Sequence, residues 1–148
     1  MKKNKISKNW INRQRRDIFV RKSKAEGYRS RAVYKLEEIH QKFKIFNNQT
    51  LVLDLGAAPG SWSQYIVKNF KNIKLAAIDL QKFDRIKNVF QITGDFTEKT
   101  YKQKILKFFN SKIDIVISDM AVNTTGNKNL DSIQTSELCL DAMRFSKE

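Results

Sequence analysis

The chain has 148 residues, of which 41% are hydrophobic and 30% charged, and this composition fits one folded domain and excludes wholesale disorder. Its apolar stretches are far shorter than the roughly 20 residues that cross a bilayer, and its start lacks the apolar segment of a secretory signal. Because Cys139 is the one cysteine, an intrachain disulfide is impossible, and we expect a cytoplasmic protein.

The positive charge is concentrated at the N-terminus. Residues 1–35 carry 13 basic and 2 acidic side chains, whereas residues 36–148 carry 16 and 13, and the whole chain has a net charge of +14. Such a cluster attracts a polyanion through counterion release, and the interleaved aromatic residues favour nucleic acid over a membrane surface. We therefore expect residues 1–26, a basic arm with a helix over residues 12–25, to bind RNA. A solubilising tail is the alternative.

Helical periodicity marks the next segment. Ser30 is placed to cap a helix over residues 30–43. The apolar residues that recur at helical spacing in it are Val33, Leu36, Ile39 and Phe43. This spacing predicts that one face of the helix packs against the rest of the domain.

Short apolar strands then alternate with helices. The expected strands cover residues 51–55, 74–79, 88–93 and 113–118, and the expected helices cover residues 62–70, 97–109 and 132–148. This order predicts an α/β fold with a Rossmann-like, doubly wound, mostly parallel sheet. The last helix has no strand after it, so we expect residues 27–148 to be a partial domain whose C-terminal strands are missing. A small sheet, or completion by another subunit, is the alternative.

The stretch DLGAAPGSW (54–62) joins the first strand to its helix, and its two glycines permit a tight turn that a ligand can approach closely. A dinucleotide-binding turn needs a glycine and a free amide where this chain has Ala58 and Pro59. Asp54 is unfavourable beside pyrophosphate but suits an ammonium group or its bound water. The turn therefore favours a phosphate-free ligand such as S-adenosylmethionine.

Two more acids follow the next strands. Asp79 ends the second strand, where an acid accepts hydrogen bonds from ribose hydroxyls. Asp95 follows the third strand and could accept from an adenine amino group. Each alone is more often a turn or cap residue, but after successive strands both would line one pocket. Trp62 is expected either near the ligand or in the core.

Five stretches of the chain carry a resemblance to a known family. They are GYRSRAVYKLEEI (27–39), LDLGAAPGSWSQY (53–65), AAIDL (76–80), TGDF (93–96) and ISDMAVN (117–123). Their order and spacing resemble those of the FtsJ/RlmE family of ribosomal RNA large-subunit methyltransferases. Two positions depart from the family pattern, since Ser61 replaces a usual glycine and Val122 a usual proline.

This resemblance implies S-adenosylmethionine-dependent 2′-O-methylation of a uridine ribose in 23S rRNA, as part of ribosome maturation. It implies a set of cofactor contacts from Gly60, Trp62, Asp79, Asp95 and Asp119. It also implies that Lys35 and Asp119 are catalytic, as the first two members of a Lys-Asp-Lys-Glu set. The second Lys, which is the usual candidate base, and the Glu have no counterpart in these 148 residues. We therefore expect the chain alone to be severely impaired.

The expected partner is large-subunit rRNA or a pre-assembled 50S subunit, bound by a monomer without metal or membrane. A non-catalytic RNA-binding or assembly factor with the same fold is the alternative from another class. Another RNA methyltransferase is the nearer one, but SDMAVN (118–123) stands where amino-group methyltransferases usually carry two prolines. Cys139 is poorly placed for cytosine C5 chemistry. A NAD-dependent oxidoreductase fits the turn least well.

Overall fold

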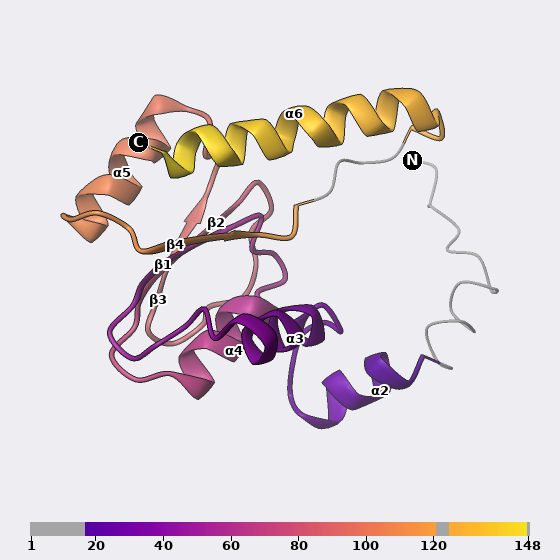
Figure 1. Cartoon of the computed structure of the whole chain (residues 1–148), viewed down its shortest axis with the longest axis vertical. Coiled ribbons are helices and arrows are strands. Elements are labelled where there is room, and N and C mark those ends of the chain that lie inside the picture. Colours follow the sequence, from indigo (N-terminus) through magenta and orange to yellow (C-terminus); the bar gives the residue numbers. More distant parts are fainter. Residues whose placement is uncertain (1–16, 121–124, 148) are drawn as a thin grey trace.

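The computed structural model describes residues 17–120 and 125–147, and its centre is a sheet of four parallel strands (Figure 1). Their bounds are β1 (Leu51–Leu55), β2 (Lys74–Asp79), β3 (Val89–Thr93) and β4 (Ile115–Ser118). The strands lie in the order β3-β2-β1-β4. The chain thus proceeds outward from β1 to β3 and returns to β4 on the other side of β1. The point where the order reverses, between β1 and β4, is where such sheets bind ligands.

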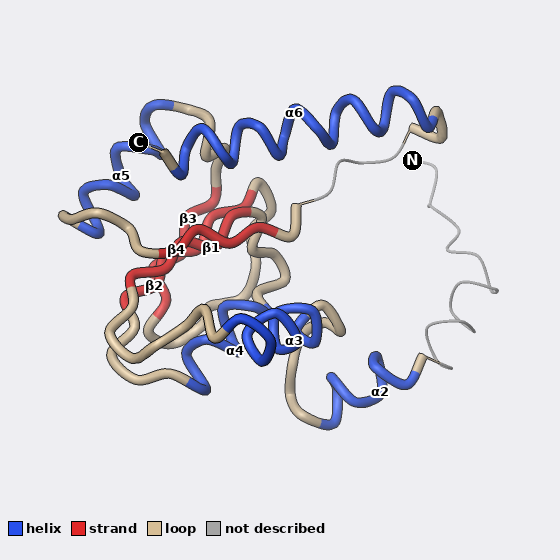
Figure 2. The backbone as a smooth tube through the Cα atoms, viewed as in Figure 1, coloured by secondary structure: helices blue, strands red, loops and turns tan. Residues whose placement is uncertain are grey.

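Helices cover both faces of this sheet (Figure 2). One face carries α3 (Val33–Phe43) and α4 (Ser61–Asn69), and the other carries α5 (Lys99–Phe109) and α6 (Lys128–Ser146). A further helix, α2 (Ile18–Ala25), precedes α3. The α/β, doubly wound, parallel arrangement that the sequence predicts is therefore confirmed.

Each face of the sheet has its own hydrophobic core, because successive side chains of a strand point to opposite faces. Val52 of β1 belongs to the core under α3 and α4, together with Val33 and Leu36. Its neighbour Leu53 belongs to the core under α5 and α6, together with Ile105. Burial on both faces explains why the strands read as nearly continuous apolar runs.

Three details of the helices differ from the sequence prediction. The Ser30 hydroxyl accepts a hydrogen bond from the Ala32 amide, so it stabilises the turn before α3, which begins three residues later at Val33. Farther along α3, Ile39 and Phe43 are 39% and 63% exposed, so the apolar face is buried only in the first turn, at Val33 and Leu36. The last helix begins at Lys128, earlier than predicted.

Of the expected RNA-binding segment over residues 1–26, the arm at residues 1–11 and the first part of the expected helix over residues 12–25 lie outside the described residues. Within the described part, α2 begins after Asp17, whose carboxylate accepts hydrogen bonds from the Phe19 and Val20 amides. Val122 also lies outside the described residues. Across residues 17–120 and 125–147, no helix has both the length and the apolar character that a membrane crossing requires.

Candidate active site

A cavity of about 490 Å³ opens at the carboxyl ends of the strands, within the size range of small-molecule sites. Residues that follow all four strands contribute to it, and α6 closes one side. The residues that line it include Gly56 and Ala58 and four acids, Asp79, Asp95, Asp119 and Asp141. The sequence prediction that acids after successive strands line one pocket is thus seen in the geometry.

The turn after β1 needs its glycines for two different reasons. Both have positive φ, +70° at Gly56 and +101° at Gly60, where side chains are strained. A Cβ at Gly56 would collide with the side chain of Met120 beside the cavity. A Cβ at Gly60 would lie 2.6 Å from the Ile86 side chain and 2.9 Å from the Arg29 guanidinium. Gly56 therefore shapes the cavity wall, whereas Gly60 lies beneath Arg29.

Asp79 is held in place by the backbone around it. Its Oδ2 accepts a hydrogen bond from the Ala58 amide at 2.9 Å, and its Oδ1 accepts one from the Gln81 amide at 2.7 Å. An ionised carboxylate has about four acceptor sites, so roughly two remain for a ligand. The fixed carboxylate is thus suited to accept hydrogen bonds from the two hydroxyls of a ribose.

Asp95 is fixed in a similar way by its own turn. Its Oδ1 accepts hydrogen bonds from both the amide and the hydroxyl of Thr97, at 2.9 and 2.7 Å. The turn that Asp95 organises follows β3, so its carboxylate lines the same cavity as that of Asp79. Asp79 and Asp95 thus line one cavity, as the sequence predicted, and their contacts with a cofactor stay a prediction.

Asp54 lies behind the cavity wall rather than in it. Its side chain is 1% exposed, and it accepts a hydrogen bond from the Ser63 hydroxyl at 2.7 Å. Burial raises the pKa of the Asp54 carboxyl to about 7, although the hydrogen bond from Ser63 acts in the opposite direction. The expected place of Asp54 near a ligand ammonium or its bound water stays a prediction; in the structure its buried carboxyl joins β1 to α4 from inside the domain.

The sequence left two positions open for Trp62, near the ligand or in the core, and the structure places it in the core. Its side chain is 8% exposed and packs in the same core as Val33 and Leu36. The indole Nε1 donates a hydrogen bond to the Ala32 carbonyl at 2.7 Å. Trp62 therefore ties α4 to the start of α3, and its assignment as a cofactor contact stays a prediction.

The two residues expected to be catalytic form an ion pair. Lys35 on α3 and Asp119 after β4 are far apart in the sequence, yet Lys35 Nζ lies 2.7 Å from Asp119 Oδ1. Their side chains are 65% and 35% exposed, so a substrate can reach them from solvent. Asp119 lines the strand-end cavity, whereas Lys35 lines a second hollow between α2 and α3. The pair thus stands at the border between two cavities.

Comparisons with known proteins identify the family and the fold. A family model described as FtsJ-like methyltransferase matches residues 28–148. The chain belongs to the FtsJ-like methyltransferase family. A crystal structure of a ribosomal RNA methyltransferase from Plasmodium falciparum superposes with a TM-score of 0.72 at 38% identity, covering 80% of this chain and 70% of that one. The fold is therefore that of Rossmann-like methyltransferases.

Two curated family members align with nearly the whole chain. Ribosomal RNA large subunit methyltransferase E of Pelagibacter ubique is 59% identical over all 148 residues, which span 73% of that protein. The protein of the same name from Rickettsia bellii is 47% identical over 147 residues, which correspond to 95% of this chain and 64% of that protein. The chain thus spans about two thirds to three quarters of the length of these relatives.

Sequence reasoning missed Arg29, whose side chain connects its own segment to the turn after β1 and to the loop after β2. Its guanidinium donates hydrogen bonds to the carbonyls of Pro59 at 2.9 Å, Asp84 at 2.8 Å and Arg85 at 3.2 Å. The residue lies in the motif RSRA (29–32), but backbone carbonyls leave no signal in a sequence, so the motif did not reveal this contact. Arg29 holds the turn after β1 against the loop that follows β2.

Asp141 was also missed, because its position depends on how α6 returns across the strand ends.

Within residues 17–120 and 125–147, no three His, Cys, Asp or Glu side chains are grouped so that they could hold a metal ion. His40 instead accepts a hydrogen bond from the Phe46 amide and packs against Phe70. It therefore has a packing role.

Proposed function

We propose that the protein is an S-adenosylmethionine-dependent methyltransferase that modifies the 2′-hydroxyl of a uridine ribose in large-subunit 23S rRNA. The observation that carries the proposal is the Lys35–Asp119 ion pair at the edge of a cavity lined with carboxylates. The names of the relatives support rRNA as the substrate. We further propose that it acts as a cytoplasmic monomer during ribosome maturation, without a metal ion, and that residues 1–26 contact the RNA.

The charge of the cavity favours S-adenosylmethionine over a dinucleotide. Four carboxylates line it, those of Asp79, Asp95, Asp119 and Asp141. Carboxylates attract the ammonium and sulfonium groups of this cofactor and repel the phosphates of a dinucleotide.

The roles of the cofactor-binding residues follow from their placement. We propose that Asp79 accepts hydrogen bonds from the ribose hydroxyls and that Asp95 accepts one from the adenine amino group. Asp119 would contact the methionine end of the cofactor while it pairs with Lys35. The family resemblance adds Gly60 and Trp62, which would act by shaping the turn, because one lies under Arg29 and the other in the core.

Lys35 is suited to orient the ribose hydroxyl. Bound S-adenosylmethionine would supply the methyl group. An ammonium paired with Asp119 has three N–H donors and no acceptor, so Lys35 would hold the 2′-oxygen without taking its proton. The proton would leave to solvent water or to a base other than Lys35. Correct positioning of the oxygen in line with the methyl group supplies much of the rate.

A methyl-transfer assay tests this function. The protein is incubated with tritiated S-adenosylmethionine and either free 23S rRNA or 50S subunits that lack the modification, and the RNA is digested to nucleosides. We expect the label in 2′-O-methyluridine. Label on a base would contradict the ribose assignment.

The same assay tests the alternative of a non-catalytic RNA-binding factor. That alternative predicts binding of cofactor and RNA without transfer by the protein or by its Pelagibacter relative, which serves as the reference enzyme.

A further inference from the structure

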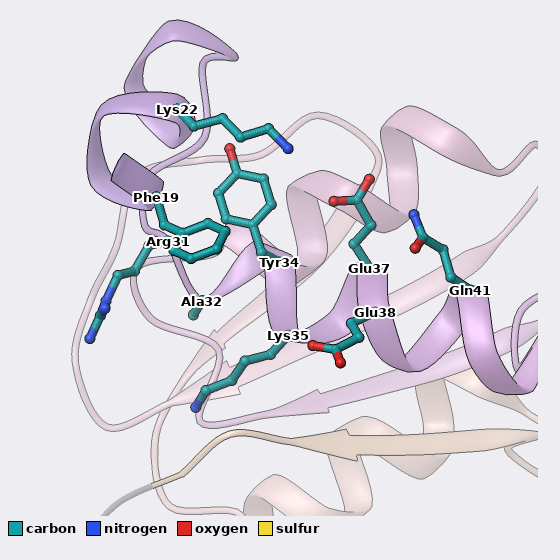
Figure 3. A pocket seen from close by; sticks show the side chains of 9 residues that line it. All are labelled: Phe19, Lys22, Arg31, Ala32, Tyr34, Lys35, Glu37, Glu38 and Gln41. Carbon is teal, nitrogen blue, oxygen red and sulfur yellow. The ribbon is translucent and has the colours of Figure 1, made fainter. Parts of the chain in front are cut away.

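The hollow between α2 and α3 is a groove of about 510 Å³, and Lys35 is one of the side chains that line it (Figure 3). Its lining includes Phe19 and Lys22 of α2, Arg31 between the helices, and Tyr34, Glu37 and Glu38 of α3. The first four place aromatic rings and cations together, whereas the last two carry negative charge farther along α3. The groove is thus aromatic and basic at one end and acidic at the other.

Two aromatic rings, the exposed Phe19 and the half-buried Tyr34, line the basic end together. The ring centroids of Phe19 and Tyr34 lie 5.5 Å apart at 45°, and Phe19 is 53% exposed. Lys22 Nζ lies 4.4 Å from the centre of the Tyr34 ring, and the Tyr34 hydroxyl donates to Glu26 at 3.0 Å. Tyr34 is therefore held from several sides, while Phe19 presents much of its surface to solvent.

The groove adjoins the proposed reaction site through one ion pair. Lys35 follows Tyr34 on α3 and lines the groove, while its partner Asp119 lines the strand-end cavity. A methyl donor in that cavity and an acceptor held in the groove would therefore meet at this ion pair. An RNA strand whose ribose lies at Lys35 must place its neighbouring nucleotide within a few ångströms of that residue.

We propose that this groove binds the unpaired nucleobase next to the reacting ribose, stacked on Phe19. The inference rests on the proposed function and specifies how the RNA is held. Aromatic side chains stack on single-stranded bases of any sequence. The enzyme would thus need a target nucleotide in a loop or an opened helix, because a base in a duplex is already stacked and paired.

The charges fix the direction in which the nucleotide lies. Lys22 and Arg31 can attract a phosphate, since their pairings with Glu26 and Asp17 are between partly exposed groups and are weakly held. Glu37 and Glu38 repel phosphate but can accept hydrogen bonds from the N–H groups of a base edge. The sugar–phosphate backbone therefore follows the wall with Lys22 and Arg31, and the base edge points along α3.

The test uses short single-stranded RNAs that carry one 2-aminopurine at successive positions, because stacking on an aromatic ring quenches this base. Their affinity and fluorescence are measured with the wild type, Phe19→Ala, Phe19→Trp and the control Phe43→Ala. Phe43 is a suitable control because it is exposed, lies on α3 and contacts a lysine, but is outside the groove.

We expect Phe19→Ala to weaken RNA binding by about 5- to 150-fold, the range expected for one stacked base, and to abolish the quenching. Phe19→Trp should retain both, and Phe43→Ala should behave as the wild type. Equal affinity of Phe19→Ala and the wild type, equal losses in Phe19→Ala and Phe43→Ala, or no RNA binding at all would each overturn the inference.

A parallel titration with S-adenosylmethionine separates this inference from the proposed function. Every variant should bind the cofactor as the wild type does, because Phe19 and Phe43 lie outside the strand-end cavity. Normal cofactor binding together with unaltered RNA binding by Phe19→Ala overturns the base-stacking site alone. Loss of cofactor binding in the wild type would instead contradict the proposed function.

Discussion

The strand-end cavity and the α2–α3 groove meet at the Lys35–Asp119 ion pair, but their walls are built differently. In the cavity, carboxylates such as Asp79 are fixed by backbone amides of adjoining turns. In the groove, the functional groups are ends of exposed side chains, such as Phe19 and Arg31. A rigid frame suits a small ligand of constant shape, whereas exposed rings and cations suit a longer and more variable polymer.

The difference also explains which region was predictable. Strand ends of a parallel sheet converge at one edge, so an acid after each strand can be placed in a common pocket from the sequence alone. The groove depends on the packing angle of two helices, which the sequence does not specify. Four predictions sharpen or break this comparison.

Lys35→Met should have the largest effect, because it removes the group at which the two regions meet. We expect kcat for methyl transfer to fall roughly 100- to 10,000-fold, the range for losing a positioned polar group, with little change in cofactor affinity. Lys42→Met removes the same charge from α3 away from the site and is the matched control. Equal rates for both variants would mean that Lys35 has no role beyond its charge.

Asp54→Asn tests whether the frame of the cavity depends on a buried carboxyl. The pKa of Asp54 rises from an ordinary 3.8 to about 7 on folding, so the protonated form is favoured in the folded state. Its contribution to stability is full below pH 3.8 and is lost as pH rises through about 7. The loss is at most about 4 kcal/mol, given about 1.4 kcal/mol per pKa unit.

Urea denaturation at about pH 5 and about pH 8 measures this effect. The wild type should lose more unfolding free energy than Asp54→Asn between the two values, since asparagine does not titrate. Substitution of a groove residue such as Phe19 should leave this pH-dependent loss of unfolding free energy unchanged. Parallel pH profiles of the two proteins would show that Asp54 is ionised in the folded state at both values.

Asp79→Asn should weaken S-adenosylmethionine binding by roughly 10- to 100-fold, because a hydrogen bond to a charged group is worth about 1.5–3 kcal/mol. Asp84→Asn is the control, since it neutralises an acid of the following loop that does not line the cavity. Circular dichroism verifies that both variants are folded. Equal affinities would remove Asp79 from the proposed cofactor site.

Arg29→Lys should have the smallest effect, a loss of about 1–2 kcal/mol in unfolding free energy, because lysine keeps the charge but not the fork that reaches three carbonyls. Arg31→Lys alters a more exposed arginine nearby and should cost less than about 1 kcal/mol. Thermal or urea denaturation compares the two. A larger loss for Arg31→Lys would contradict the role given to Arg29.

The sequence predicted the sheet well because its strands are short, buried apolar runs between clear turns, such as β1 before the glycine-rich turn. It placed Asp79, Asp95 and Asp119 correctly along the strand ends for the same reason. Burial of Asp54 could not be read from the sequence, because an acid at a strand end can face either the cavity or the interior of the domain.

The resemblance, rather than the spacing, paired Lys35 with Asp119. A lysine on a helix is ordinarily a surface residue, and nothing in its local sequence indicates a carboxylate 84 positions away. The same holds for Arg29, Asp141 and the Phe19–Tyr34 pair, whose partners are distant or belong to backbone groups. Contacts between elements, unlike the elements themselves, require the three-dimensional structure.

Calorimetric titration of the folded protein with S-adenosylmethionine and, separately, with NAD tests the central claim most directly, because that claim concerns what the acid-lined cavity accepts. The account predicts saturable binding of the sulfonium cofactor at one site and no binding of the dinucleotide. Binding of NAD without uptake of S-adenosylmethionine would contradict it.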